Sequence, residues 1–513
     1  MRPFLLPPSA KNDFVDGAVD ARSKEDWHQA LSQDHRMTLE EYTSHDATGL
    51  ASLVDAGDIT PLELTRLARQ AYEQTNPSIN AVIEFYDDAE VVPGCDAGLF
   101  HGVPFLRKDA GAAEAGRLQE CGSRLLKGLR PQTGSHFFDR ARRGGLRVIG
   151  RTALPEFGTS GMSESLLNGI TQNPWSLGRS AGGSSSGAAA AVAAGIVPIA
   201  HASDGGGSIR IPAAWCGLVG LNPSRGRVSN GPKVQDSLFG FSRQFVLCRS
   251  VRDMAAALDV FSGSYPNDPF AAPEAKRPYL EEMSLPTGRL RVGIARTQWG
   301  AVEVEPEISQ AVETTASLLE DMGHIVIDIR PPYDPSEKTR LWKIRSPHNA
   351  RILGNDARSL NRRIDASTIE PINLKIYEHG RRNPVIPIEE IVESVRQFQN
   401  SVSELIDMFD VLLTPTMPVL PPSHGSMYST TNPTLTAVEF MAADTALYQY
   451  LGVFNVTGHP SVSLPLAHSA SGLPIGLQIV GRMGDEATLV RISRDLEEAC
   501  PWHHRKPPLR AGA

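Results

Sequence analysis

Two glycine-rich clusters that contain serine lie close together in the chain, at residues 182–187 and 204–208. Glycine lets the backbone approach another group closely and leaves bare N–H groups that can donate hydrogen bonds. A serine hydroxyl beside such donors could attack a carbonyl carbon while the donors stabilise the oxygen that becomes negative. The second cluster therefore predicts a nucleophile at Ser208 and an oxyanion hole in the turn 205–208. An apolar segment before the cluster and the sequence IRIP after it argue against a flexible linker.

Ser184, in the first cluster, allows three interpretations. The simplest is an N-cap, because the alanine-rich segment 187–195 that follows predicts a helix and serine is a favoured N-cap residue. A phosphate cradle is disfavoured because no Lys-Ser or Lys-Thr pair follows the glycines. A dinucleotide site is disfavoured because no G-x-G-x-x-G motif follows a strand here.

Lys108 follows the apolar segment 101–106 and Arg107. The end of an apolar segment is an unusual place for a lysine. A side chain that reaches back to water is the common outcome for such a residue. The alternative is a buried lysine that acts as a base. An ordinary lysine is neutral in only roughly one molecule in 2,500 at pH 7, but burial can lower its pKa by several units.

The other candidate groups have structural interpretations. None of the 14 histidines has HExxH or another metal-ligand spacing, so His201 and His459 are interpreted as structural. Glu156 could be a general acid on its own, but within Pro155–Gly158 it is better explained as a carboxylate that holds a loop. The five cysteines are scattered, without a CxxC pair. We therefore expect no metal and no cofactor.

The bulk composition excludes several classes of protein. A chain of 513 residues with 41% hydrophobic residues can bury a large core. A net charge of −8 gives no support for binding to nucleic acid or to an anionic membrane surface. No apolar run is long enough to span a membrane, and the N-terminal apolar run is too short for a secretory signal. Together with the scattered cysteines, these features predict a cytoplasmic protein without a nucleic-acid or membrane partner.

Strand and helix patterns alternate along the chain, which is typical of an α/β fold with a central sheet. Thr60, Pro61 and Glu63 together form a helix start with a capping box. Further helices are expected at 134–144, 187–195, 250–262 and 305–322 and from Asp485 onward. Strands are expected at 80–85, 101–106, 147–151, 196–200, 289–295, 324–329, 410–415 and 472–481.

We expect one large domain at residues 46–505, preceded by an N-terminal extension at 1–45. The extension is polar and poorly periodic, with a short helix at 24–32, and could provide the contact of a homodimer. Residues 331–400 have no clear pattern and are expected to form an irregular helical cap. The variable segments 121–135 and 331–450 are expected to line the substrate pocket.

Taken together, these motifs resemble the amidase signature family over about residues 45–500. The order and spacing of the matching segments make the resemblance specific. They are 102–104 with Lys108 and Asp109, 155–158, 173–175, 182–185, Asp204 with 206–212, Cys216 with Gly217, 220–221, 226–229, 454–460 and 472–478.

The resemblance implies a mixed sheet flanked by helices on both faces and an amidase with a Ser-Ser-Lys triad. Ser208 would be the nucleophile, and Ser184, with a cis peptide bond, would relay its proton to the base Lys108. The N–H groups of Gly205, Gly206, Gly207 and Ser208 would form the oxyanion hole. Asp204 and Arg210 would support this loop. The product would be an acyl-enzyme on Ser208 that water hydrolyses.

The sequence departs from the family pattern at several positions next to the triad. Arg107 stands where an apolar residue is more common, and Ser186 and Ala188 where glycine and serine are common. Asn222 and Ser224 replace the usual lysine and threonine. These changes bear on rate and substrate preference rather than on the chemistry.

Segments 173–180 and 198–201 resemble the branch of the family that contains 6-aminohexanoate cyclic dimer hydrolase. Linear amides, cyclic amides, anilides, carbamates and esters all remain open as substrates. Two other functions also remain open: an amidotransferase-type subunit that releases ammonia from glutamine for a partner, and an inactive binding protein with the same fold.

Overall fold

The computed structural model describes residues 37–233 and 239–513, and within α11 (Pro335–Ser359) only the backbone is described at 335, 338, 339 and 342–345. Residues 39–513 form one compact unit. Most of the expected extension, including its helix at 24–32, lies outside the described residues. The described part begins shortly before α2 (Leu39–Ser44).

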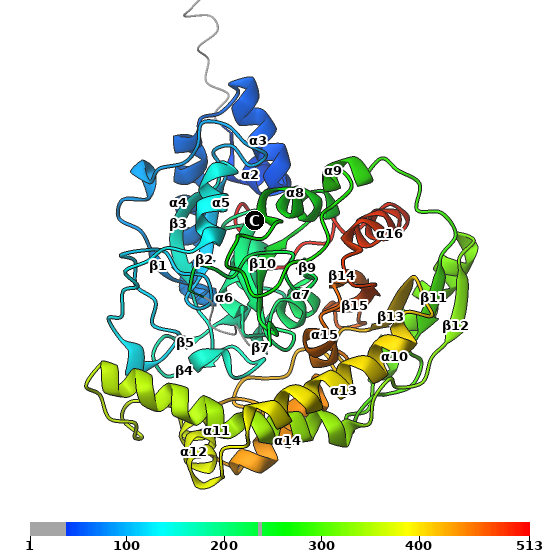
Figure 1. Ribbon diagram of the computed structural model, residues 1–513. Coiled ribbons are helices and arrows are strands. Elements are labelled where there is room, and N and C mark those ends of the chain that lie inside the picture. The colour runs from blue at the N-terminus through cyan, green and yellow to red at the C-terminus, as the bar shows by residue number, and fades with distance from the viewer. Residues whose placement is uncertain (1–36, 234–238) are drawn as a thin grey trace, which may run out of the picture. The chain divides into compact units, whose positions relative to one another are not determined.

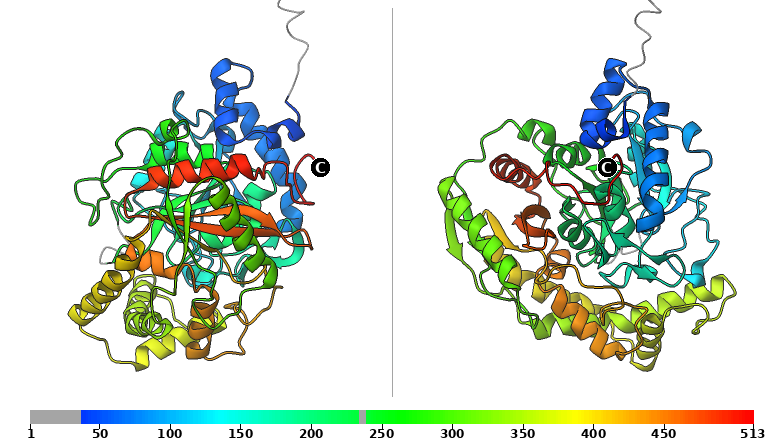
Figure 2. Two further views of the ribbon diagram at one scale, coloured as in Figure 1. Left: turned by 90° about the vertical axis from the view of Figure 1, so that its right-hand side faces the viewer. Right: turned by 180° about the vertical axis from the view of Figure 1, so that it is seen from behind.

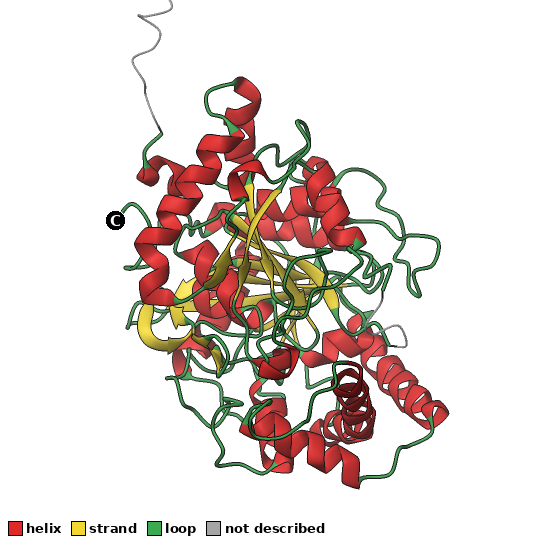
Figure 3. Cartoon of the chain, turned by 90° about the vertical axis from the view of Figure 1, so that its left-hand side faces the viewer, coloured by secondary structure: helices red, strands yellow, loops and turns green. Residues whose placement is uncertain are grey.

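A mixed sheet of eleven strands forms the centre of this unit (Figures 1 and 3), in the order β1-β3-β2-β8-β10-β9-β14-β15-β13-β11-β12. The strands β2, β3 and β8 are parallel, as are β13, β11 and β12, and the strands between these two groups are antiparallel. The bounds are β1 Val82–Phe85, β2 Pro104–Lys108, β3 Arg147–Thr152, β8 Ile199–Asp204, β9 Val219–Asn222, β10 Arg243–Cys248, β11 Arg291–Ile294, β12 Ile325–Asp328, β13 Val411–Pro415, β14 Ser461–His468 and β15 Pro474–Gly481.

Helices cover both faces of the sheet, as expected (Figures 2 and 3). α6 packs on β2 and β8, α7 on β14 and β15, and α16 on β14 and β15. The helix bounds are α3 Ala47–Ala56, α4 Pro61–Ile79, α5 His136–Arg143, α6 Ser186–Ala193, α7 Arg210–Cys216, α8 Val251–Phe261, α9 Tyr279–Glu282, α10 Pro306–Asp321, α12 Pro371–Arg382, α13 Ile388–Ile406, α14 Ala437–Leu447, α15 Gly452–Thr457 and α16 Glu486–Ala499.

Local sequence explains two of these helices well. α4 begins with the expected capping box: the Glu63 N–H donates to Thr60 Oγ1 (3.2 Å), and the Thr60 N–H donates to Glu63 Oε2 (2.8 Å). α6 consists of small residues and is buried along its whole length. A Cβ atom at Gly187 would lie 2.2 Å from the Ala81 carbonyl oxygen, so only glycine fits this close approach. The small-residue helix therefore lies directly against the strands of the site.

Two of the predicted strands lie later in the chain than expected. The strand predicted at 101–106 is β2, Pro104–Lys108, so Lys108 belongs to the strand itself. The strand predicted at 196–200 is β8, Ile199–Asp204, because Pro198 has no N–H to contribute to the ladder and lies in the preceding turn. The shift matters for the site. It places Asp204 at the carboxyl end of the strand, directly before the second glycine cluster.

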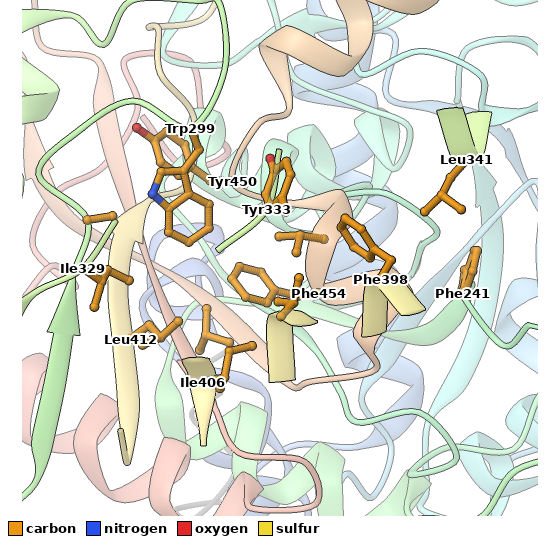
Figure 4. Close-up of a cluster of buried hydrophobic side chains, with 14 of the residues drawn as sticks. Phe241, Trp299, Ile329, Tyr333, Leu341, Phe398, Ile406, Leu412, Tyr450 and Phe454 are labelled. Carbon is orange, nitrogen blue, oxygen red and sulfur yellow. The ribbon is translucent and has the colours of Figure 1, made fainter. Parts of the chain in front are cut away.

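The expected cap consists of the helices α11, α12 and α13 together with α14, which pack against one another on one side of the sheet (Figure 1). An apolar cluster fastens α13 to the core. Its aromatic side chains are drawn in Figure 4: the ring of Phe398 in α13 lies 5.7 Å from that of Tyr333, and the ring of Trp299 lies 6.2 Å from those of Tyr333 and Phe454. The cap is therefore packed against the sheet through a continuous buried contact.

Candidate active site

Lys108 is the last residue of β2, and only 1% of its side chain area is exposed. Successive residues of a strand point to opposite faces, so the neighbouring Arg107 lies on the other side of β2. There Arg107 Nε donates to the Tyr86 hydroxyl (2.7 Å), and the guanidinium lies 3.6 Å from Glu114. The unusual arginine therefore does not expose Lys108.

Three hydroxyl groups surround the Lys108 ammonium nitrogen. Nζ lies 2.8 Å from Ser184 Oγ, 2.9 Å from Ser185 Oγ and 3.0 Å from Ser203 Oγ. Burial lowers the pKa of Lys108 to about 7, against the opposing effects of Asp204 and Cys121. A large fraction of this lysine is thus neutral near pH 7 and can accept a proton.

The loop 182–185 carries Ser184 to this nitrogen. The Gly183–Ser184 peptide bond is cis. The N-cap of α6 is Ser185, and its side chain makes no capping hydrogen bond, so the N-cap interpretation of Ser184 was wrong. Ser184 is also buried, with 3% of its area exposed. Its hydroxyl is therefore directed to Lys108 rather than to the helix.

Ser208 lies in the turn between β8 and α7 and faces the same cavity as Lys108 and Ser184. The Ser185 N–H donates to the Ser208 carbonyl oxygen (3.3 Å), which joins the two glycine clusters. Among the described residues, no hydrogen bond links the hydroxyls of Ser184 and Ser208. Catalytic hydrogen bonds are often long without substrate and tighten in the complex.

The four expected oxyanion donors do not all remain available. The Gly207 N–H donates to Asp204 Oδ1 at 2.7 Å, and Gly207 has a φ of 131° that favours glycine. In this structure that N–H is already engaged and serves to shape the turn. Gly205 is exposed and, with Gly206 and Ser208, lines the cavity.

Asp204 and Arg210 form a fully buried ion pair beneath this turn, with Arg210 Nε 2.9 Å from Asp204 Oδ2. Asp204 also accepts from the Ile209 N–H (3.2 Å), and Arg210 holds its pKa well below the usual range. The rest of the guanidinium donates to Gln478 Oε1 (2.8 Å) and Asn455 Oδ1 (2.6 Å). Each charged group is thus surrounded by partners, and the turn is tied to β15 and α15.

We expect Asp204→Asn to destabilise the protein by about 3–5 kcal/mol, because it leaves the buried Arg210 without its counter-charge. The matched control is Glu90→Gln, which removes an exposed ion pair with Arg66 at 3.3 Å and should cost less than about 1 kcal/mol. Urea unfolding followed by circular dichroism measures both. Equal stability of the two variants would show that the buried pair does not hold the turn.

The cavity above these residues has a volume of about 520 Å³. The core provides Lys108, the two serines and the segment 157–161, and the cap provides side chains of α11, α12 and α14, among them Ile352, Tyr377 and Phe440. The expected contribution of 331–450 is thus present. None of the residues 121–135 lines the cavity; Leu125 and Leu126 of this segment instead pack in a buried cluster with Ala357 and Ile369.

The remaining candidates have the structural roles that were expected. His201 Nδ1 accepts the Lys108 backbone N–H (3.2 Å), Nε2 lies 2.9 Å from Gln244 Oε1, and burial lowers the pKa of His201 to about 3. His459 Nδ1 bonds to the Thr457 hydroxyl. Glu156 accepts hydrogen bonds from Ser123 and from the start of α12, and so holds a loop. Both histidines are therefore neutral, and neither lines the cavity.

Four further residues belong to the site, although no role was predicted for them. Ser185 and Ser203 bind Lys108, while Asn455 and Gln478 bind Arg210. Ser185, Asn455 and Gln478 lie within segments that carried the family resemblance. Their position in those segments indicated that they matter, but the sequence did not show which residue each of them binds.

The departures from the family pattern are also accommodated. Ser186 Oγ donates to the Ala153 carbonyl (3.3 Å), away from Ser184. Asn222 Oδ1 accepts from Arg243 (3.1 Å), and the Ser224 N–H donates to Glu486 (2.8 Å). None of these three residues lines the cavity.

The family model described as Amidase matches residues 63–490, and the chain belongs to the amidase signature family. It is 35% identical to the 6-aminohexanoate-cyclic-dimer hydrolase of Paenarthrobacter ureafaciens over 475 residues, which cover 90% of this chain and 96% of that enzyme. A solved structure of 6-aminohexanoate cyclic dimer hydrolase complexed with substrate superimposes with a TM-score of 0.85 at 34% identity, covering 91% of this chain and 99% of the other.

A bacterial aryl acylamidase of the same family gives a TM-score of 0.75 at 26% identity, covering 89% of this chain and 96% of the other. These relatives hydrolyse amides, and this chain is an amidase that acts on C–N bonds. A glutamyl-tRNA(Gln) amidotransferase chain from Thermotoga maritima is 24% identical with a TM-score of 0.72, which shows a common fold alone. No helix of the described part is long and apolar enough to cross a membrane.

Proposed function

We propose that this enzyme hydrolyses a carboxylic amide through an acyl-enzyme on Ser208, with Ser184 and Lys108 as the other members of the triad. The observation that carries the proposal is the 2.8 Å contact between Lys108 Nζ and Ser184 Oγ, in the wall of the cavity that Ser208 also lines.

The neutral amine of Lys108 accepts the proton of Ser184 as Ser184 takes the proton of Ser208. The Ser208 oxygen then forms a bond to the carbonyl carbon of the substrate, and the carbonyl oxygen becomes negative. The N–H groups of Gly205, Gly206 and Ser208 stabilise this oxygen, while Gly207 and the ion pair beneath it fix the turn. One such donor is worth about 3–4 kcal/mol in the transition state.

The proton then returns from Lys108 through Ser184 to the amide nitrogen, and the C–N bond breaks. The amine leaves, and the acyl group remains as an ester on Ser208. A water molecule repeats the sequence, gives its proton to the same relay and releases the acid. The same three groups therefore serve both halves of the reaction.

The substrate that we propose is a cyclic or secondary amide with a large apolar part. Aromatic and aliphatic side chains line much of the cavity, and its volume of about 520 Å³ accommodates more than a small primary amide. The 35% identity to 6-aminohexanoate-cyclic-dimer hydrolase favours a cyclic amide as the first candidate. The five cysteines are free, which fits the cytoplasmic location that composition predicts.

A substrate panel tests this proposal. The cyclic dimer of 6-aminohexanoate, its linear dimer, an acetanilide, an aryl carbamate and glutamine are incubated with the enzyme, with Ser208→Ala as the blank. We expect the cyclic dimer or the anilide to give the highest kcat/KM, at least about tenfold above glutamine. If glutamine were the best substrate, the amidotransferase alternative would replace this proposal.

A further inference from the structure

Two buried glutamates lie at the same junction between the cap and the core, where the Glu370 backbone N–H donates to the Glu156 carboxylate. Glu156 belongs to the turn Glu156–Gly158 of the core, and Glu370 is the N-cap of the cap helix α12. Each has only 1% of its area exposed, and neither lines the cavity. A buried pair of like groups requires an explanation, because each ionised carboxylate is costly to remove from water.

Glu156 joins the core to the beginning of α12. Its Oε1 accepts the Ser123 hydroxyl of the core at 2.7 Å. Its Oε2 accepts the Glu370 N–H at 2.7 Å and Asn373 Nδ2 at 2.8 Å. The Glu370 side chain does not cap its own helix. The carboxylate of Glu156 therefore satisfies the N-terminus of α12 from another part of the chain.

Glu370 extends the same junction in the other direction. Its Oε1 accepts the Leu166 N–H at 2.8 Å, and its Oε2 lies 2.5 Å from the Thr430 hydroxyl. A protonated Oε2 could donate to that hydroxyl without any change of position, since the hydroxyl can also accept. The two carboxyls thus connect the 156–158 turn and the start of α12 with the segments of Ser123, Leu166 and Thr430.

The charges around the pair do not balance two carboxylates. Arg124 is the positive group that acts on both, but its guanidinium donates to the carbonyls of Ala366 and Ile369, both at 3.2 Å. A third carboxylate, Glu164, lies two residues before Leu166. It contacts His424 (3.7 Å) and accepts the Gly425 N–H (2.8 Å). Burial raises the pKa of both carboxyls, and the charge of Glu156 helps to raise that of Glu370 to about 7.

The junction lies directly behind the substrate cavity. Phe157 and Gly158 follow Glu156, and Asn373 binds it; all three line the cavity. A Cβ atom at Gly158 would be 2.9 Å from Ser184 Oγ, so this turn also touches the site. A movement of α12 away from Glu156 would therefore widen the cavity on the side of the cap.

We propose that Glu156 and Glu370 form a proton-dependent clamp that positions α12 and thereby sets the affinity for substrate. This inference rests on the proposed function, because side chains of α12 line the cavity in which that reaction would take place. When Glu370 is protonated, Glu156 carries the negative charge of the junction and α12 stays docked. When Glu370 loses its proton, a second buried negative charge lies near that of Glu156, and the docked arrangement is weakened.

The sign of the pH dependence follows from the raised pKa of Glu370. A carboxyl that is harder to ionise when docked favours docking fully at low pH, below its ordinary value near 4.5. This stabilisation of the docked state decreases as the pH rises toward about 7, and above that value the stability of the docked state does not change further. KM should therefore increase between pH 5 and pH 7 and then level off, which separates it from the effect of Lys108 on kcat.

The test compares KM of the wild type, Glu370→Gln and Glu378→Gln between pH 5 and pH 8, with the cyclic dimer of 6-aminohexanoate as substrate. Glutamine reproduces the protonated carboxyl and cannot titrate. Glu378 is an exposed carboxylate on the same helix, 3.3 Å from Arg382, and serves as the control. We expect KM to increase at least about threefold in the wild type and in Glu378→Gln but to stay flat in Glu370→Gln.

Hydrogen exchange of the α12 amides provides a second readout that requires neither turnover nor a variant. After correction for the intrinsic rate, we expect protection of α12 to fall between pH 5 and pH 7 in the wild type. A wild-type KM and α12 protection that do not change with pH would overturn the clamp, as would a Glu370→Gln variant that follows the wild type. If the proposed triad were wrong, the triad variants would keep their kcat, and the exchange result for α12 would be unaffected.

Discussion

Ser208→Ala is expected to reduce kcat for amide hydrolysis by about four to six orders of magnitude. The hydroxyl oxygen is the atom that forms the acyl-enzyme, and no other group in the turn 205–208 can replace it. Removal of a nucleophile from comparable serine hydrolases has effects of this size. Steady-state hydrolysis of the best amide in the panel measures the loss.

The control is Ser186→Ala, which removes another buried hydroxyl a few residues from Ser184. Ser186 donates to the Ala153 carbonyl and does not line the cavity, so we expect less than about a tenfold change in kcat. If Ser208→Ala kept the wild-type rate, or if both variants lost activity equally, Ser208 would not be the nucleophile.

Lys108→Met is expected to lower kcat by about 10²–10⁴-fold, since methionine has a similar length and no proton acceptor. In the wild type, burial places the pKa of Lys108 at about 7, and only the neutral amine is active. Wild-type kcat should therefore rise about tenfold per pH unit below pH 7 and reach a plateau above it. The residual activity of Lys108→Met should lack this rise.

The matching control is Arg107→Met, on the opposite face of the same strand. It removes a buried cation that contacts Tyr86, so it should reduce stability while the pH dependence of kcat persists. A pH dependence that survives in Lys108→Met would assign the ionisation to another group, and the proposed base would be wrong.

The strands that carry the site were largely predictable because they are short apolar runs. The end of β2 was recognised from the position of Lys108, and the two glycine clusters located the loops. Three strands of the eleven-stranded sheet were missed. β14 contains Pro465, near a register irregularity between Leu464 and Ala467, which interrupts the alternating pattern. β9 and β10 pair antiparallel between β8 and β14, and that pairing depends on distant residues.

The parts of the site that could not be predicted depend on contacts across long sequence separations. Arg210 was recognised beside Asp204, but Gln478 and Asn455 reach it from segments more than two hundred residues away. The engagement of the Gly207 N–H follows from the turn geometry, which the letters GGGS do not specify. The Glu156–Glu370 junction was hidden for the same reason, since only the fold brings the cap to the core.

Labelling with a fluorophosphonate, followed by peptide mapping, tests the central claim most directly. The reagent forms a stable bond to an activated serine oxygen, and the modified peptide identifies which serine that is. We expect a single adduct on Ser208 in the wild type, slower labelling in Lys108→Met and none in Ser208→Ala. An adduct on Ser184 or Ser185, or the same labelling of Ser208→Ala, would contradict the proposed mechanism.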